Sequence, residues 1–93
     1  MMKVWKLIPG QPVEELEVKG DPMRFAREVI NATMDVTRVR YLGKLRPMAV
    51  DDEGMCKELP VNEEATKAYH ANCKPGTVWP ICGPAVIFER SPR

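Results

Sequence analysis

Two stretches near the start of the chain show the apolar patterning of β-strands. Val4–Ile8 is rich in apolar residues and is stopped by a Pro-Gly pair. In Val13–Lys19, Leu16 and Val18 point to one side while Glu and Lys residues point to the other. Alternation with a period of two is typical of a half-buried strand, and Pro-Gly pairs mark turns. We therefore predict that these two strands form a hairpin.

Two other stretches carry the signals of short helices. In Pro22–Ala32 apolar residues recur at spacings of three and four, which places them on one helical face. Asp21 is suited to cap the first helix, and Asn62 is suited to cap a second helix over Glu63–Tyr69. Pro22 at the first helical position favours the start of the first helix, and Glu63 and Glu64 in the first turn favour the start of the second. The apolar face of the first helix consists of Phe25, Ala26, Val29 and Ile30.

The middle of the chain predicts three further strands. Val36–Leu42 alternates, and a tight Gly-Lys turn connects it to Leu45–Val50. Pro47 lies inside the second of these strands, which indicates an edge strand or a bulge, since proline has no N–H for a sheet ladder. An acidic turn then leads to a third predicted strand, Met55–Leu59.

The last predicted strand, Ala85–Phe88, is apolar at every position and should lie deep in the sheet. The order of elements predicts an α+β fold: a small, mostly antiparallel sheet of about five to six strands, with two short helices packed on one face. We expect residues 1–90 to form a single domain and residues 91–93 to form a tail.

Composition limits the classes of protein that fit. With 93 residues, 44% hydrophobic and 29% charged, the chain is typical of one globular domain. The net charge of +1 creates no general attraction to nucleic acid or membranes. No apolar run reaches the roughly 20 residues of a membrane helix, and the N-terminus lacks the pattern of a signal peptide. Three cysteines cannot all pair, so reduced thiols and a cytoplasmic location are expected.

Several short motifs are shared with a known family. The acidic turn Asp51-Asp52-Glu53-Gly54 is followed by Leu59-Pro60-Val61-Asn62, then by Gly76-Thr77 and by Gly83-Pro84-Ala85-Val86-Ile87. An opening strand that ends in Pro-Gly, as Leu7-Ile8-Pro9-Gly10 does, completes the pattern. The chain thus resembles a small domain-of-unknown-function family carried mainly by bacteriophages and bacterial mobile elements. The resemblance implies the cytoplasm of a bacterial host cell, and it supplies no catalytic residues.

Metal binding and catalysis find little support in the sequence. Cys56, His70, Cys73 and Cys82 have the ligand chemistry of a zinc site, but only His70 and Cys73 are close in the sequence. Isolated cysteines more often act as small buried hydrophobes. The chain has one histidine and no glycine-rich phosphate loop. We therefore expect a protein that is not an enzyme and that uses no metal or cofactor.

Basic residues gather on the hairpin at positions 36–50, which is the candidate binding site. Arg38, Arg40 and Arg46 are the expected contacts for an anion, and Tyr41 or Trp79 could provide a stacking surface. Two tryptophans and six methionines either fill the core or form an interface.

We expect a non-enzymatic accessory protein of a phage or mobile element that sequesters or blocks a host target, for example in counter-defence. The target would be a host protein or a small anionic ligand, and a ligand pocket between subunits would make the protein a homo-oligomer. The alternative is a nucleic-acid-binding accessory protein that uses the basic hairpin. A membrane partner is not expected.

Overall fold

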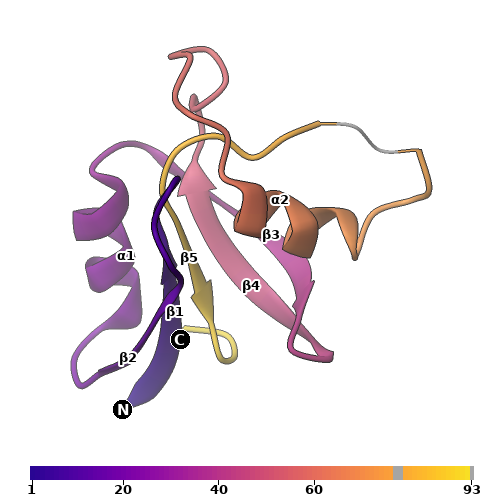
Figure 1. Cartoon of the computed structure of the whole chain (residues 1–93). Coiled ribbons are helices and arrows are strands. Elements are labelled where there is room, and N and C mark those ends of the chain that lie inside the picture. The colour runs from indigo at the N-terminus through magenta and orange to yellow at the C-terminus, as the bar shows by residue number, and fades with distance from the viewer. Residues whose placement is uncertain (77–78, 93) are drawn as a thin grey trace.

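The structure is a computed structural model that describes residues 1–76 and 79–92, and it has the predicted α+β architecture (Figure 1). Within this part of the chain, five strands form one antiparallel sheet in the order β2-β1-β5-β4-β3. None of the helices described is long and apolar enough to cross a bilayer. The elements are β1 (Met2–Leu7), β2 (Glu14–Val18), α1 (Pro22–Ile30), β3 (Met34–Tyr41), β4 (Lys44–Asp51), α2 (Glu63–His70) and β5 (Ala85–Phe88).

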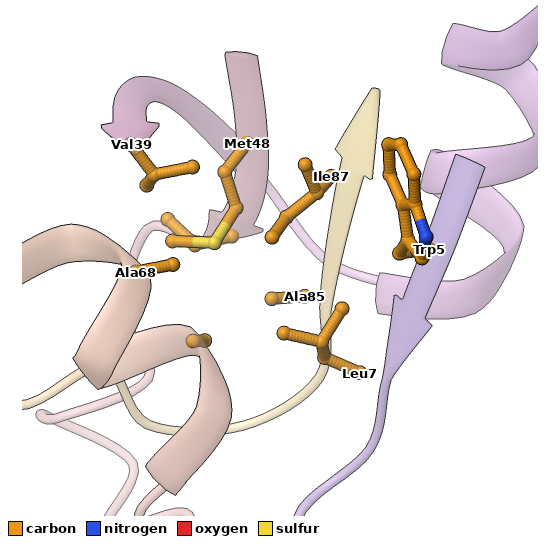
Figure 2. Close-up of a cluster of buried hydrophobic side chains, with 9 residues drawn as sticks. Trp5, Leu7, Val39, Met48, Ala68, Ala85 and Ile87 are labelled. Carbon is orange, nitrogen blue, oxygen red and sulfur yellow. The ribbon is translucent and has the colours of Figure 1, made fainter. Parts of the chain in front are cut away.

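The two helices cover opposite faces of the sheet, so the prediction that both lie on one face was wrong (Figure 1). Alternate residues of β1 show the reason: Trp5 and Leu7 face α2, whereas Met2 and Val4 face α1. A strand that is apolar on both sides needs cover on both sides. Figure 2 shows the cluster on the α2 side, to which four strands and α2 contribute. Its labelled residues are Trp5, Leu7, Val39, Met48, Ala68, Ala85 and Ile87.

Strand β5 is the centre of the sheet, as its continuous apolar run predicted. All four of its side chains are fully buried. It pairs with β1 on one side and with β4 on the other. Val86 and Phe88 pack under α1, and Ala85 and Ile87 pack under α2. This short strand therefore joins the two hairpins into one sheet and supplies both halves of the core.

Asn62 is the predicted cap of α2, and it does more than cap the helix. Its Oδ1 accepts a hydrogen bond from the Ala65 amide at 3.2 Å. Its Nδ2 donates to the carbonyls of Leu7 and Gly83, both at 2.9 Å. The side chain is buried, so these bonds form without competition from water. Asn62 thus ties the start of α2 to the end of β1 and to the segment that precedes β5.

The predicted strand over Met55–Leu59 is not formed; this segment consists of turns. Asp51 holds the turns, because its carboxylate accepts hydrogen bonds from the Glu53 amide at 2.8 Å and from Lys57 Nζ at 3.0 Å. Burial alone would raise the pKa of Asp51, but these two donors stabilise the anion and hold the pKa below its usual range. Local polar contacts therefore outweigh the modest strand tendency of the segment.

Strand β4 lies inside the sheet, so the edge-strand prediction was wrong for its second half. Met48–Val50 pairs with both β3 and β5. The register with β5 begins at Met48, and Pro47 is paired only with Arg38 of β3. Arg38–Pro47 cannot be a hydrogen-bonded pair, because Pro47 has no N–H. Proline is accommodated because the ladder with β5 ends before it.

The β3–β4 hairpin turns at Leu42 and Gly43, one residue earlier than predicted. Both residues have positive φ, 50° for Leu42 and 79° for Gly43. Glycine adopts this conformation without strain, whereas the Cβ atom of a leucine makes it unfavourable. The Leu42 side chain is also 64% exposed, so no packing compensates for the cost.

We expect Leu42→Asn to stabilise the fold by roughly 0.5–1 kcal/mol, because asparagine tolerates the left-handed conformation better than leucine does. The measurement is the free energy of unfolding in urea. Leu45→Asn is the matched control, since Leu45 is also exposed but lies in β4, where asparagine is disfavoured. Equal effects of the two substitutions would contradict the backbone argument.

We expect Asn62→Ala to destabilise the fold by about 2–4 kcal/mol, because it removes a cap and leaves two buried carbonyls without their donor. The control is Asp21→Ala, which removes the exposed cap of α1, a bond of 3.0 Å to the Met23 amide, and should cost about 1 kcal/mol. Urea unfolding of both variants measures the difference. If Asn62→Ala cost no more than Asp21→Ala, the two carbonyl bonds would be shown to contribute nothing.

Candidate functional site

Arg38 and Arg40 lie two residues apart on β3, and both are exposed. Their positions share a face of the sheet with Val36, whose partner Ala49 belongs to the core under α1. The two arginines therefore extend from the α1 side of the sheet. Residues two apart on a strand are about 6–7 Å apart, so both guanidinium groups can reach one extended or branched anion.

A groove of about 690 Å³ lies beside Arg38 on this face. It forms because α1 packs mainly over β5, with smaller contacts to β1 and β4, which leaves the outer part of the β3–β4 hairpin uncovered. The segment after β5 provides the other wall. The residues lining the groove are Met23, Val36, Thr37, Arg38, Leu45, Arg46, Pro47, Glu89, Arg90, Ser91 and Pro92.

The lining of the groove combines apolar and cationic side chains. Val36 is 45% exposed and Leu45 is 49% exposed, which is high for aliphatic residues on a sheet face. Arg38 and Arg90 bring positive charge to the groove. Among the described residues that line the groove, Glu89 is the one with a carboxylate side chain, and its Oε1 lies 3.1 Å from Arg90 Nη1. The groove therefore offers an apolar surface with net positive charge beside it.

Arg46 borders the groove, but its guanidinium group extends to the opposite face. Nε donates to the carbonyl of Tyr41 at 2.9 Å, and Nη1 donates to the carbonyl of Glu89 at 3.0 Å. The group also lies 4.8 Å from the centre of the Trp5 ring. The residue is only 9% exposed. The structure thus separates Arg46 from Arg38 and Arg40 and uses it to hold the hairpin against β1.

Tyr41 lies on the same side as Arg46, away from the two exposed arginines. Its ring meets the ring of Trp5 edge-on, with centroids 5.3 Å apart. Burial raises the pKa of Tyr41, and the carboxylates of Glu64 and Glu15 raise it further. A tyrosine that packs on tryptophan among carboxylates is poorly placed to stack on an anionic ligand held by Arg38.

Trp79 is 64% exposed, but it does not join Arg38 and Arg40. Its carbonyl accepts a hydrogen bond of 2.7 Å from His70 Nε2, at the end of α2. Since α2 packs on the other face of the sheet, this bond holds Trp79 on the side away from the arginine side chains. Of the five predicted site residues, Arg38 and Arg40 therefore share the α1 side of the sheet, whereas Arg46, Tyr41 and Trp79 lie on the α2 side.

The residues considered as metal ligands do not gather into a site. Among the residues that the structure describes, no three His, Cys, Asp or Glu side chains could hold one ion. Cys56 is exposed, Cys73 is half-buried and Cys82 is buried. His70 and Cys73 are close because a helix-end turn connects them, with the Cys73 amide donating to the His70 carbonyl at 3.1 Å.

The motifs that carry the family resemblance serve the fold rather than the groove. A side chain on Gly54 would collide with the carbonyl of Cys82. Gly83 has a φ of 86°, and its amide donates to the carbonyl of Pro60 at 2.8 Å. Together with Asn62, these residues fasten the turns of 51–62 to the approach of β5. Of the Gly76-Thr77 motif, Thr77 lies outside the described residues, as does Arg93 of the tail.

Sequence reasoning missed the apolar part of the groove. Val36, Arg38 and Arg40 are spaced by two along β3, and Leu45 is the cross-strand partner of Arg40. A period of two along the hairpin therefore already places these residues on one face. Arg90 could not have been found in this way, because its position depends on how the chain turns after β5.

No known protein family, curated protein or solved structure matches this chain. The resemblance to the phage family therefore stays a prediction, and the candidate site rests on its geometry.

The three arginines should differ in their effect on stability. We expect Arg46→Met to cost about 2–3 kcal/mol, because it removes two charge-assisted hydrogen bonds and a cation–π contact. Arg38→Met and Arg40→Met should change the free energy of unfolding by no more than about 0.5 kcal/mol, as is usual for exposed sites. Urea unfolding measures all three. A large loss in the free energy of unfolding with Arg38→Met would show that Arg38 has a structural role, and would weaken the case for it as a binding residue.

Proposed function

We propose that this protein is a non-enzymatic binding protein that holds an anionic partner on the groove beside Arg38 and Arg40. The single observation that carries the proposal is the pair of exposed arginines on one face, next to half-exposed Val36 and Leu45. A guanidinium group stays charged at all physiological pH values and can donate two parallel hydrogen bonds to a carboxylate or phosphate. This chemistry suits recognition.

Catalysis is less well supported by the same groove. The lining residues include no histidine, cysteine or lysine that could act as a base or nucleophile. Glu89, the one carboxylate among the described lining residues, is paired with Arg90, and its Oε1 also lies 3.4 Å from the amide of Lys3. The hydroxyls of Thr37 and Ser91 therefore have no unpaired base among these lining residues to activate them. The groove therefore offers charge and apolar contact but little acid–base chemistry.

The resemblance to a phage and mobile-element family suggests what such binding would achieve. A small protein of this kind would act in the cytoplasm of a bacterial host, by occupying a host protein or a small anionic ligand and so blocking it. Counter-defence is one setting in which this mode of action is useful. If the ligand is small, a second copy of the chain would be needed to enclose it, because the groove is open to solvent.

Nucleic acid is the second candidate partner. Arg38, Arg40 and Lys44 are exposed on a hairpin whose tip carries the exposed, strained Leu42. Apolar side chains flanked by basic residues can insert between base pairs. Against this, the groove has no aromatic lining on which bases could stack, and the guanidinium of Arg46 is already engaged.

The test compares two double variants of equal charge in a bacterial extract. We expect the wild-type protein to retain a partner that native mass spectrometry detects. The amount of partner retained by Arg38→Ala/Arg40→Ala should be lower by at least about tenfold. The control is Arg24→Ala/Arg27→Ala, which removes two exposed arginines of α1 that do not line the groove. Retention by both variants, or loss from both, would contradict the proposal.

A salt series separates the two classes of partner. Nucleic acid would be favoured if the affinity for a fluorescent oligonucleotide falls steeply and log-linearly with salt concentration. This affinity should also depend on Arg38, Arg40 and Lys44. A protein or small-ligand partner would be retained after nuclease treatment.

A further inference from the structure

We infer that the occupant of the groove is an extended peptide segment of another protein in which acidic residues alternate and are followed by an apolar one. This inference rests on the proposed function and deepens it, because it names the class of partner. It follows from three properties of the groove: its shape, its charge and the state of the neighbouring sheet edge.

The shape fits a strand of peptide. A volume of about 690 Å³ lies within the range of ligand sites, yet the groove runs over a sheet face and is open to solvent. Val36 and Leu45 are each close to half exposed and lie four positions apart along the hairpin, with Pro47 between them. An apolar side chain of an extended peptide would cover Val36 at one end of this row. A compact, highly charged ion such as phosphate would leave this surface uncovered.

The charge requires acidic residues in the partner. Within the described chain, no carboxylate lies within ion-pair distance of Arg38 or Arg40, although five other ion pairs form. The nearby carboxylate of Glu89 is held by Arg90. The two arginines are therefore available to carboxylates from outside. No aromatic side chain lines the groove, so peptide carboxylates fit better than a nucleotide, whose base would need a stacking partner.

The edge of the sheet is already occupied, so the peptide would bind on the face. β3 is an edge strand, and its outward backbone groups could in principle accept an added strand. The Val36 amide, however, donates to Oδ1 of Asp35 at 3.0 Å. The Arg38 carbonyl accepts from Nδ2 of Asn72 at 3.3 Å. These contacts interfere with pairing along the edge and leave side-chain recognition on the face.

The spacing of the arginines sets the peptide pattern. Positions 36, 38 and 40 repeat every two residues, about 6–7 Å apart, and an extended peptide has the same repeat on each of its sides. Two acidic residues separated by one residue would therefore meet Arg38 and Arg40, and the next residue on that side would meet Val36. The expected pattern is acidic-any-acidic-any-apolar, read in either direction.

The experiment is selection from a random peptide display library on the immobilised full chain. We expect the selected peptides to be enriched in Asp or Glu at alternate positions with an apolar residue two positions beyond. The same selection on Arg38→Ala/Arg40→Ala should lose this pattern, and selection on Arg24→Ala/Arg27→Ala should keep it.

One selected peptide is then measured by fluorescence anisotropy. We expect Arg38→Ala/Arg40→Ala to weaken binding at least about tenfold, and Val36→Ser to weaken it several-fold, since the first change removes charge and the second removes apolar contact. The Arg24→Ala/Arg27→Ala control should stay within about twofold. Raised salt should weaken binding to the wild type and change binding to the arginine variant much less.

Three results would overturn the inference: no enrichment of acidic peptides, selected peptides that bind the arginine variant as well as the wild type, or a Val36→Ser variant that binds unchanged. The proposed function would survive any of these if the partner retained from bacterial extract still depended on Arg38 and Arg40. If that dependence were also absent, the proposed function itself would be wrong.

Discussion

The fold depends on one buried polar side chain that joins three distant parts of the chain. Asn62 starts α2, and its amide nitrogen also donates to the end of β1 and to the residue that begins the approach to β5. Leu7 and Gly83, which carry these carbonyls, are buried, so both bonds form away from water. Because α2 is short, the bonds of Asn62 fix where this helix lies over its face of the sheet.

The open part of the sheet is a consequence of how two short helices cover two faces. α1 lies mainly over the central strand and α2 lies toward β3 on the other side (Figure 1). On the α2 side, Arg46 and Tyr41 complete the cover over Trp5. On the α1 side no side chain of the described residues covers Val36 and Leu45 in this way. The basic groove therefore lies on one face of the hairpin, and the opposite face of the same hairpin is covered.

The sequence predicted the elements better than their arrangement. The caps at Asp21 and Asn62 and the buried run of β5 follow from local rules, and all three were confirmed. The two helices were assigned to one face of the sheet, because the apolar side of a helix does not show which sheet face it will pack against. Arg46 was assigned to the site on its charge, although alternation along β4 places it on the face opposite to Leu45; that it meets Trp5 there depends on the neighbouring strands. Such outcomes depend on strand order and register, which arise from the whole chain.

The position of β5 also constrains the order in which the molecule can be made. The strand at the centre of the sheet comes last along the chain, after both hairpins. During synthesis each hairpin can form as it leaves the ribosome, but the two cannot join until Ala85–Phe88 has emerged. Until then the apolar surfaces that later cover β5 are exposed to solvent. The nascent chain therefore completes its core in one late step, when β5 pairs with both β1 and β4.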